Sequence, residues 1–126
     1  MSGRYWSLLY NQAMIRILAI VLLFCIGVAN ADTQQEIDHL LSFVASTDCE
    51  YDRNGAIHSG PEARDHINMK YQHYKKKVET TEDFIKYSAT KSKISGRKYQ
   101  IRCPDQEAVD SNEWLLKELQ SYRAGK

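Results

Sequence analysis

The sequence predicts a small, mainly α-helical domain of the α+β class, with about four helices, a short β element and one disulfide bond. Three observations predict this class. Apolar residues recur at helical spacing in several segments, one segment alternates polar with apolar residues, and two cysteines stand far apart in the same region. A length of 126 residues allows one domain at most.

An apolar run near the N-terminus predicts export. The uncharged residues 17–28 follow the basic Arg16, and Ala29-Asn30-Ala31 then fits the small-x-small pattern that signal peptidase cleaves. We therefore expect residues 1–31 to be a signal peptide that is cleaved after Ala31, and residues 32–126 to form a single mature domain.

Other interpretations of this N-terminal segment are weaker. An uncleaved membrane anchor would need about 20 apolar residues, and Arg16 prevents the run from extending backwards. Met14 is an alternative start of the natural chain. Lipidation at Cys25 is not favoured, because the bulky Phe24 precedes it. We expect no stable membrane span once the signal is cleaved.

The cysteines and the charge balance limit the functions of residues 32–126. This segment has 15 Lys and Arg against 16 Asp and Glu, which gives no basic footprint for nucleic acid. Cys49 and Cys103 are its two cysteines, and in an exported protein they most simply form one disulfide. A catalytic thiol is not favoured, because an oxidising compartment and a partner cysteine both oppose it.

Helical periodicity predicts the elements and the core. A first helix is expected over 33–47, with a capping-box pattern in residues 33–36, and His39 is expected to be solvated. The other predicted helices cover 60–78, a short segment after Thr80 or Thr81, and 112–123. The residues predicted to face the core are Ile37, Leu40, Leu41, Val44, Ala63, Ile67, Tyr71, Tyr74, Val78, Leu115, Leu119 and Tyr122.

Between these helices we expect a loop and a strand. Residues 49–60 are expected to form a loop with a tight turn at Arg53-Asn54-Gly55, because Asn and Gly tolerate positive φ. The alternation over 98–103 predicts a half-buried strand, with a turn before it at Ser95-Gly96.

Several spaced motifs carry a family resemblance. They are Cys49-x-Tyr51-x-Arg53-Asn54-Gly55, His58-x-Gly60, Glu62-Ala63, His66-Ile67, Lys70-Tyr71, Ser95-Gly96-x-x-Tyr99-x-Ile101-x-Cys103, Trp114-Leu115, Glu118-Leu119 and Tyr122-Arg123. In their order and spacing they resemble a family of small exported bacterial proteins of unknown function. The resemblance covers nearly the whole mature chain. It implies a single-domain periplasmic protein, and it implies no reaction.

A polar set before and within the second predicted helix is the first candidate site. It consists of Arg53, Asn54, His58, Glu62 and His66. Glu62 and His66 are four residues apart, so the carboxylate could orient the imidazole as a general base. Arg53 could hold a carboxylate or phosphate. The alternative is structural, with Glu62 completing a capping box.

Metal binding and cofactor binding are not expected. His66, Met69 and His73 lie on one flank of the second helix, but the two histidines are about 10.5 Å apart along its axis. That distance is too long for one ion, and no cofactor motif is present.

A protein-contact surface is the last candidate. Ser95, Gly96 and Tyr99 form a Ser-Gly-x-x-Tyr pattern that resembles the loop with which some periplasmic lysozyme inhibitors enter their target. Trp114 is expected to be partly exposed as an interface anchor, or to pack under the loop 104–110.

These observations favour a non-enzymatic binding or interaction protein with an envelope protein as a possible partner. It would present the loop 51–62 and the turn 95–99 as recognition surfaces. The alternatives are a small envelope hydrolase that uses His58 or His66 with Glu62, and an inhibitor of a peptidoglycan hydrolase.

Overall fold

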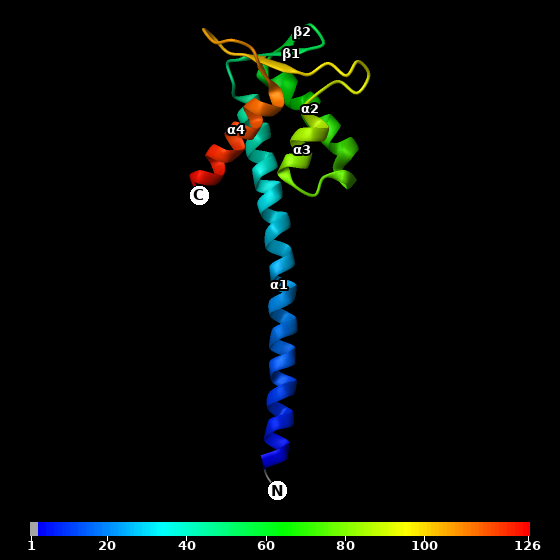
Figure 1. Cartoon of the computed structure of the whole chain (residues 1–126), viewed down its shortest axis with the longest axis vertical. Coiled ribbons are helices and arrows are strands. Elements are labelled where there is room, and N and C mark those ends of the chain that lie inside the picture. Colours follow the sequence, from blue (N-terminus) through cyan, green and yellow to red (C-terminus); the bar gives the residue numbers. More distant parts are fainter. Residues whose placement is uncertain (1–2) are drawn as a thin grey trace. The chain divides into compact units, whose positions relative to one another are not determined.

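The computed structural model describes residues 3–126, with side chains for residues 9–16 and 32–126 (Figure 1). Its elements, in chain order, are α1 (Gly3–Ala45), β1 (Glu50–Arg53), β2 (Ala56–His58), α2 (Gly60–Tyr74), the 3-10 helix η1 (Lys75–Lys77), α3 (Thr81–Ser88), β3 (Gln100–Arg102), β4 (Val109–Asp110) and α4 (Ser111–Ala124). The mainly helical α+β class predicted from the sequence is confirmed.

The chain divides into two units, Met1–Asp32 and Thr33–Lys126. In the first unit the described side chains, residues 9–16, are all exposed. The rest of the predicted signal peptide, including Cys25, lies outside the residues whose side chains are described, and cleavage after Ala31 stays a prediction. Within the described part of the chain, no helix is long and apolar enough to cross a bilayer.

The expected start of a helix at Thr33 is wrong for the full chain. Helix α1 already contains the residues before Thr33, and it ends at Ala45. Backbone N–H groups inside a helix bond to carbonyls of the preceding turn, so none of them needs a cap here. Glu36, the expected capping residue, is instead 8% exposed and accepts a hydrogen bond from Arg123.

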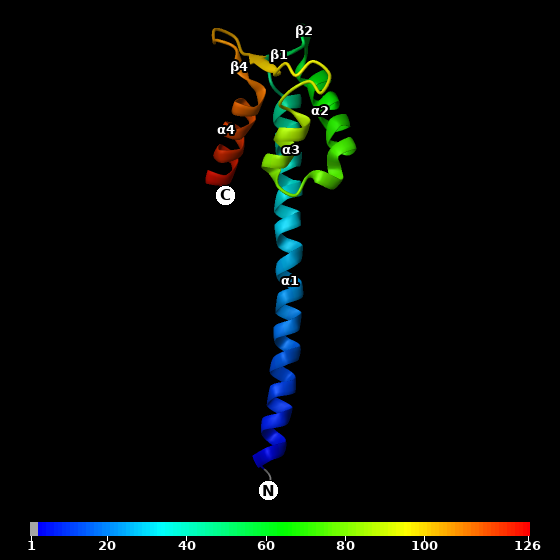
Figure 2. The same cartoon turned by 45° about the vertical axis from the view of Figure 1, so that its right-hand side comes forward.

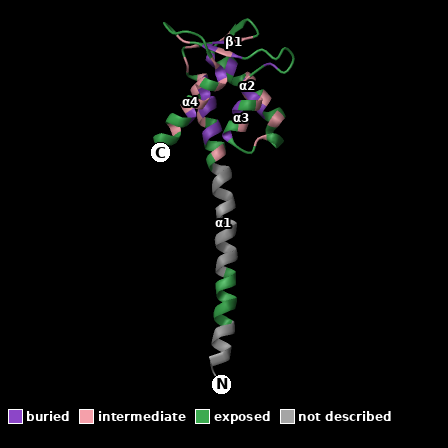
Figure 3. Cartoon of the chain, in the orientation of Figure 1, coloured by how far each residue is buried: buried purple, intermediate pink, exposed green. Residues whose placement is uncertain are grey.

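The second unit places helices around the C-terminal part of α1. In both views α2 and α4 lie on opposite sides of that part, and the strands lie at one end of the helices (Figures 1 and 2). Buried residues concentrate where these elements meet (Figure 3). The buried apolar residues are Ile37, Leu40, Leu41, Val44, Tyr51, Ala63, Ile67, Tyr71, Phe84, Ile85, Ala89, Tyr99, Ile101, Leu115 and Leu119. The core predicted from periodicity is confirmed, except that Tyr74, Val78 and Tyr122 are only partly buried.

The expected loop at residues 49–60 is a β-hairpin. Strands β1 and β2 pair antiparallel, with Arg53 opposite Ala56, and Asn54 and Gly55 have φ of 57° and 84°. Two consecutive positive φ values are what a two-residue turn needs to match the twist of paired strands. The predicted tight turn is therefore confirmed, and the expected loop on either side of it is corrected to strands.

The hairpin extends into a four-stranded antiparallel sheet in the order β2-β1-β3-β4. Glu50 pairs with Arg102, which brings the residues just outside these two strands together. There Cys49 and Cys103 form the predicted disulfide, with Cα atoms 4.2 Å apart. The bond fixes the β1–β3 pairing at the end where the chain leaves α1.

Local capping signals set the starts of α2 and α3. Ser59 and Glu62 form a capping box at the first, and Thr80 and Asp83 form one at the second. In each, the hydroxyl accepts from a backbone N–H and the carboxylate accepts from the N–H of the capping residue. These short-range bonds satisfy donors that a helix start leaves free.

Two polar contacts connect α1 to α4. Arg123 donates to both carboxylate oxygens of Glu36, at 2.8 and 2.9 Å, and also reaches Glu82. His39 lies 2.7 Å from the Glu118 carboxylate and stacks on Tyr122 at 4.0 Å between ring centroids. The expectation that His39 is merely solvated is therefore wrong.

Candidate functional site

Two segments predicted as recognition surfaces lie together in the structure. The Ser95 hydroxyl donates to the Asn54 side-chain carbonyl at 2.7 Å, which ties the turn before β3 to the tip of the β1–β2 hairpin. Ser95 also accepts from the backbone N–H of Arg97, and Gly96 has a φ of 71°. The Ser95-Gly96 turn is confirmed, and it is held against the hairpin by side chains 41 residues apart.

Glu62 caps the N-terminus of α2. Its carboxylate accepts the Ser59 backbone N–H at 2.9 Å and lies 3.7 Å from His58 Nδ1. The bond from Ser59 holds the pKa of the Glu62 carboxyl below its usual range, with His58 adding to the effect. The carboxylate is thus committed to Ser59 and His58 rather than to His66, as the capping alternative predicted.

His66, Lys70 and Tyr99 form the centre of the site. Lys70 Nζ donates to the Lys91 carbonyl at 2.8 Å and to the Tyr99 hydroxyl at 3.3 Å. The same hydroxyl lies 3.5 Å from His66 Nε2, and the His66 and Tyr99 rings meet edge to face. Helix α2 places His66 and Lys70 one turn apart, and the strand alternation turns Tyr99 inward toward them.

The charge around this cluster is positive. Burial, together with the neighbouring Arg53, Lys70 and His58, lowers the pKa of His66 to about 4. Burial and Arg53 also lower the pKa of Lys70. The neighbouring groups that act on these two pKa values are basic side chains, and each lowers the pKa because positive charge disfavours protonation nearby. His66 is consequently neutral at pH 7, although cations surround it.

A pocket of about 400 Å³ opens beside this cluster. Its volume lies within the range of small-molecule sites in proteins. Its lining combines cations, aromatic rings and exposed apolar side chains. The lining residues are His66, Met69, Lys70, His73, Tyr74, Ser92, Lys93, Ile94 and Tyr99. His66 and Tyr99 were predicted as site residues, whereas Lys70, Lys93 and Ile94 were not assigned to the site.

The pocket's two histidines do not make a metal centre. Among the residues that the structure describes, no group of three or more His, Cys, Asp or Glu side chains is arranged to hold a metal ion. The pocket lining itself contains no carboxylate. A cation would therefore meet positive charge and no anionic ligand there.

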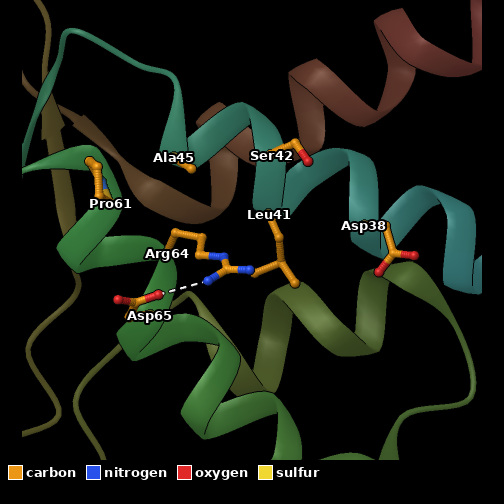
Figure 4. Close-up of a pocket in the computed structure, with 7 residues that line it drawn as sticks. All are labelled: Asp38, Leu41, Ser42, Ala45, Pro61, Arg64 and Asp65. Carbon is orange, nitrogen blue, oxygen red and sulfur yellow. Dashed lines mark hydrogen bonds and ion pairs between the residues drawn. The ribbon is translucent and has the colours of Figure 1, made fainter.

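In two further pockets the lining contains acidic side chains as well as cations. One of about 580 Å³ lies between α1 and α2, and in it Arg64 is paired with Asp65 at 2.8 Å (Figure 4). Another, of about 290 Å³, lies beside the hairpin and contains the Lys98–Asp110 pair. Only the pocket at His66, among these three, combines several cations with a lining free of acids.

Trp114 is partly exposed, as one of the two alternatives expected, whereas Tyr99 is buried. Trp114 is partly buried, and its ring packs on Phe43 of α1 with centroids 4.5 Å apart. Tyr99 is 2% exposed. A side chain buried to this extent cannot enter another protein's cleft, so the resemblance to lysozyme-inhibitor loops loses the residue that carried it.

The sequence pattern of a family of unknown function, DUF5329, matches residues 31–123. The chain belongs to this family, which confirms the resemblance to an uncharacterised family seen in the motifs.

One relative is the uncharacterized protein YfeK of Salmonella typhimurium, which is 32% identical over 71 residues. The match covers 56% of this chain and 59% of that protein, so the chain spans about three fifths of its relative's length. No solved structure matches the chain.

Proposed function

We propose that this protein is an exported, non-enzymatic binding protein of the bacterial cell envelope. Its binding surface consists of the β1–β2 hairpin, the segment 92–99 and the flank of α2 that carries His66. The observation that carries the proposal is the pocket of about 400 Å³ at the junction of α2 with segment 92–99. Exposed Met69 and Ile94 add apolar surface to its lining. Exposed apolar residues around a cavity are typical of binding sites.

A hydrolase is less well supported by the same geometry. His66 lines the pocket, whereas His58 and Glu62 do not. The Glu62 carboxylate is bonded to Ser59 and its side chain is 64% exposed. A general base needs a group such as a carboxylate that orients it within the reaction site, whereas His66 contacts the hydroxyl and ring of Tyr99.

Binding at this surface can be tested by photo-crosslinking in living cells. Ile94 is fully exposed, so a photoreactive amino acid at position 94 should leave the fold intact. Met69 provides a second position in the pocket lining, and exposed Gln120 on α4 is the matched control. We expect the same adduct from positions 69 and 94 and none from position 120. No adduct, or the same adducts from all three positions, would contradict the proposal.

Export and signal cleavage can be tested separately from binding. The apolar run 17–28 and Ala29-Asn30-Ala31 support cleavage after Ala31, and a disulfide is typical of an oxidising compartment. The protein from the periplasmic fraction should begin at Asp32 by mass spectrometry. Ala31→Trp should block cleavage, whereas Ser42→Trp, an exposed position beyond the site, should not. A cytoplasmic, unprocessed chain would refute export.

A further inference from the structure

From the geometry of the pocket beside His66 we infer that its ligand is a small anionic amphiphile, with a carboxylate or phosphate group on an apolar body. This inference rests on the proposed binding function and specifies the chemical class of the ligand. Three features lead to it: positive charge without a carboxylate in the lining, an aromatic and apolar lining, and hydrogen-bonding groups of Lys70 and His66 beside the cavity.

The positive charge is the first feature. Lys70 and Lys93 line the pocket, and Arg53 lies close enough to act on the charge of His66 and Lys70. The pocket contains no carboxylate in its lining. Partly buried cations that repel one another are stabilised by an anion placed among them, because it replaces repulsion with attraction.

The apolar part of the lining is the second feature. The Tyr74 ring lies under the Lys93 ammonium at 5.7 Å, and Met69 and Ile94 are 62% and 100% exposed. When an apolar group of a ligand covers side chains exposed to this degree, apolar surface leaves water and binding becomes more favourable. A purely ionic ligand such as inorganic phosphate would leave this surface in water.

The donors are the third feature. Lys70 has three N–H bonds, of which the Lys91 carbonyl and the Tyr99 hydroxyl accept two. His66, which is neutral, can donate or accept through its imidazole nitrogens. A carboxylate or phosphate in the pocket can accept a hydrogen bond from the third N–H of Lys70, and its negative charge favours protonation of His66.

The test uses four probes that share an octyl or heptyl chain: octanoate, octyl phosphate, octanol and octylammonium. The protein is titrated with each at pH 7, and binding is followed by NMR shifts of the Met69 methyl group and the His66 ring. We expect octanoate or octyl phosphate to bind at least tenfold more tightly than octanol and octylammonium. Bound anion should also raise the pKa of His66 toward its usual value.

Charge-removing variants provide the controls. Lys93→Met and Lys70→Met should each weaken binding of the anionic probe about fivefold, the effect of one partly exposed ion pair. Lys117→Met, on the exposed surface of α4, should leave it unchanged. Among the described residues, exposed Lys93 contacts the Tyr74 ring, so its variant tests the charge even if Lys70→Met disturbs the fold.

The failure of this inference is distinguishable from failure of the proposed function. Equal binding of all four octyl and heptyl probes would show an apolar pocket without charge selectivity, and no binding of either anion would exclude the ligand class. In both cases, adducts from positions 69 and 94 in cells would still support a binding protein.

Discussion

At the scale of single residues, two ionisable groups have environments that shift their pKa in the same direction for opposite reasons. His66 is held neutral by burial and by neighbouring cations, which lower its pKa to about 4. Glu36 is held charged by Arg123 and Thr81, which lower its pKa to about 2. Both shifts mean that the unfolded chain binds a proton more readily than the folded one. Both therefore reduce stability as the pH falls.

Glu36→Gln should lower the free energy of unfolding at pH 7 by about 2 kcal/mol, the contribution of hydrogen bonds to a charged group. In the native protein this stabilisation is present above the usual pKa of 4.5 and is lost as the pH falls toward 2. Urea denaturation at pH 7, 4.5 and 3 measures it. The matched control is Glu82→Gln, which removes a half-exposed partner of the same Arg123 and should cost less than about 1 kcal/mol.

His66→Gln should flatten the fall in stability between pH 6.5 and pH 4. In that range the unfolded chain protonates His66 while the folded chain does not, so the native protein loses stability. Denaturation at pH 7 and pH 5 compares the two slopes. His73→Gln changes an exposed imidazole on the same helix and should keep the native slope. An unchanged slope in His66→Gln would show that the fold does not lower the pKa of His66.

At the scale of elements, the start of α2 is placed by a close approach of two backbones. A Cβ atom on Gly60 would lie 2.5 Å from the Val44 carbonyl oxygen and 3.1 Å from that of Thr47. These atoms belong to the end of α1 and the residues after it, so they cannot move aside as a flexible side chain does. Glycine at this position allows α2 to begin directly against α1, which in turn places His66 two turns further along.

Gly60→Ala should destabilise the protein by about 2 to 3 kcal/mol, because the added methyl group forces two helices apart. Thermal unfolding followed by circular dichroism measures the loss. Gly125→Ala is the control: its Cβ would meet nothing closer than 3.6 Å, and its effect should lie within about 0.5 kcal/mol. Native stability in Gly60→Ala would mean that the two helices do not approach this closely.

The elements also show what the sequence could and could not predict. The capping boxes at Ser59 and Thr80 were predictable because their partners lie three residues away. Strand β2 was missed because it has three residues, which are largely exposed and show no alternating burial. His39 was misjudged because its partner Glu118 is 79 residues distant, and no local pattern encodes such a contact.

The candidate site was also only partly predictable from the sequence. His66 and Tyr99 were selected for their residue types, and Lys70 could have been found as well, since it follows His66 by one helical turn. Ile94 offered no signal, because an isoleucine in a turn is unremarkable until the segment is known to fold against α2. The contact of Glu62 with His66 was expected from spacing alone, and the capping bond to Ser59 overrode it.

At the scale of the whole molecule, one covalent bond closes most of the domain into a loop. Cys49 and Cys103 are 54 residues apart, and the segment between them contains the hairpin, α2, α3 and the whole candidate site. Cross-linking a loop of this length removes conformational freedom from the unfolded chain. A domain of about 95 residues with a small apolar core depends strongly on such a constraint.

The double variant Cys49→Ser, Cys103→Ser should lose about 4 kcal/mol of stability, from the loop length in the chain-entropy model. Urea denaturation of oxidised native protein, reduced native protein and the double variant measures it. Reduced native protein should match the double variant, because both lack the bond. Equal stability of all three would show that the bond contributes nothing to the fold.

The position of Glu36 has a consequence for maturation. Glu36 and Ile37 are the first buried residues of the second unit along the chain, and the residues from Asp32 to Gln35 are exposed or partly exposed. About one helical turn therefore separates the proposed scissile peptide after Ala31 from the first side chain that the core requires. Cleavage at that peptide bond would leave every buried residue of Thr33–Lys126 in the mature polypeptide.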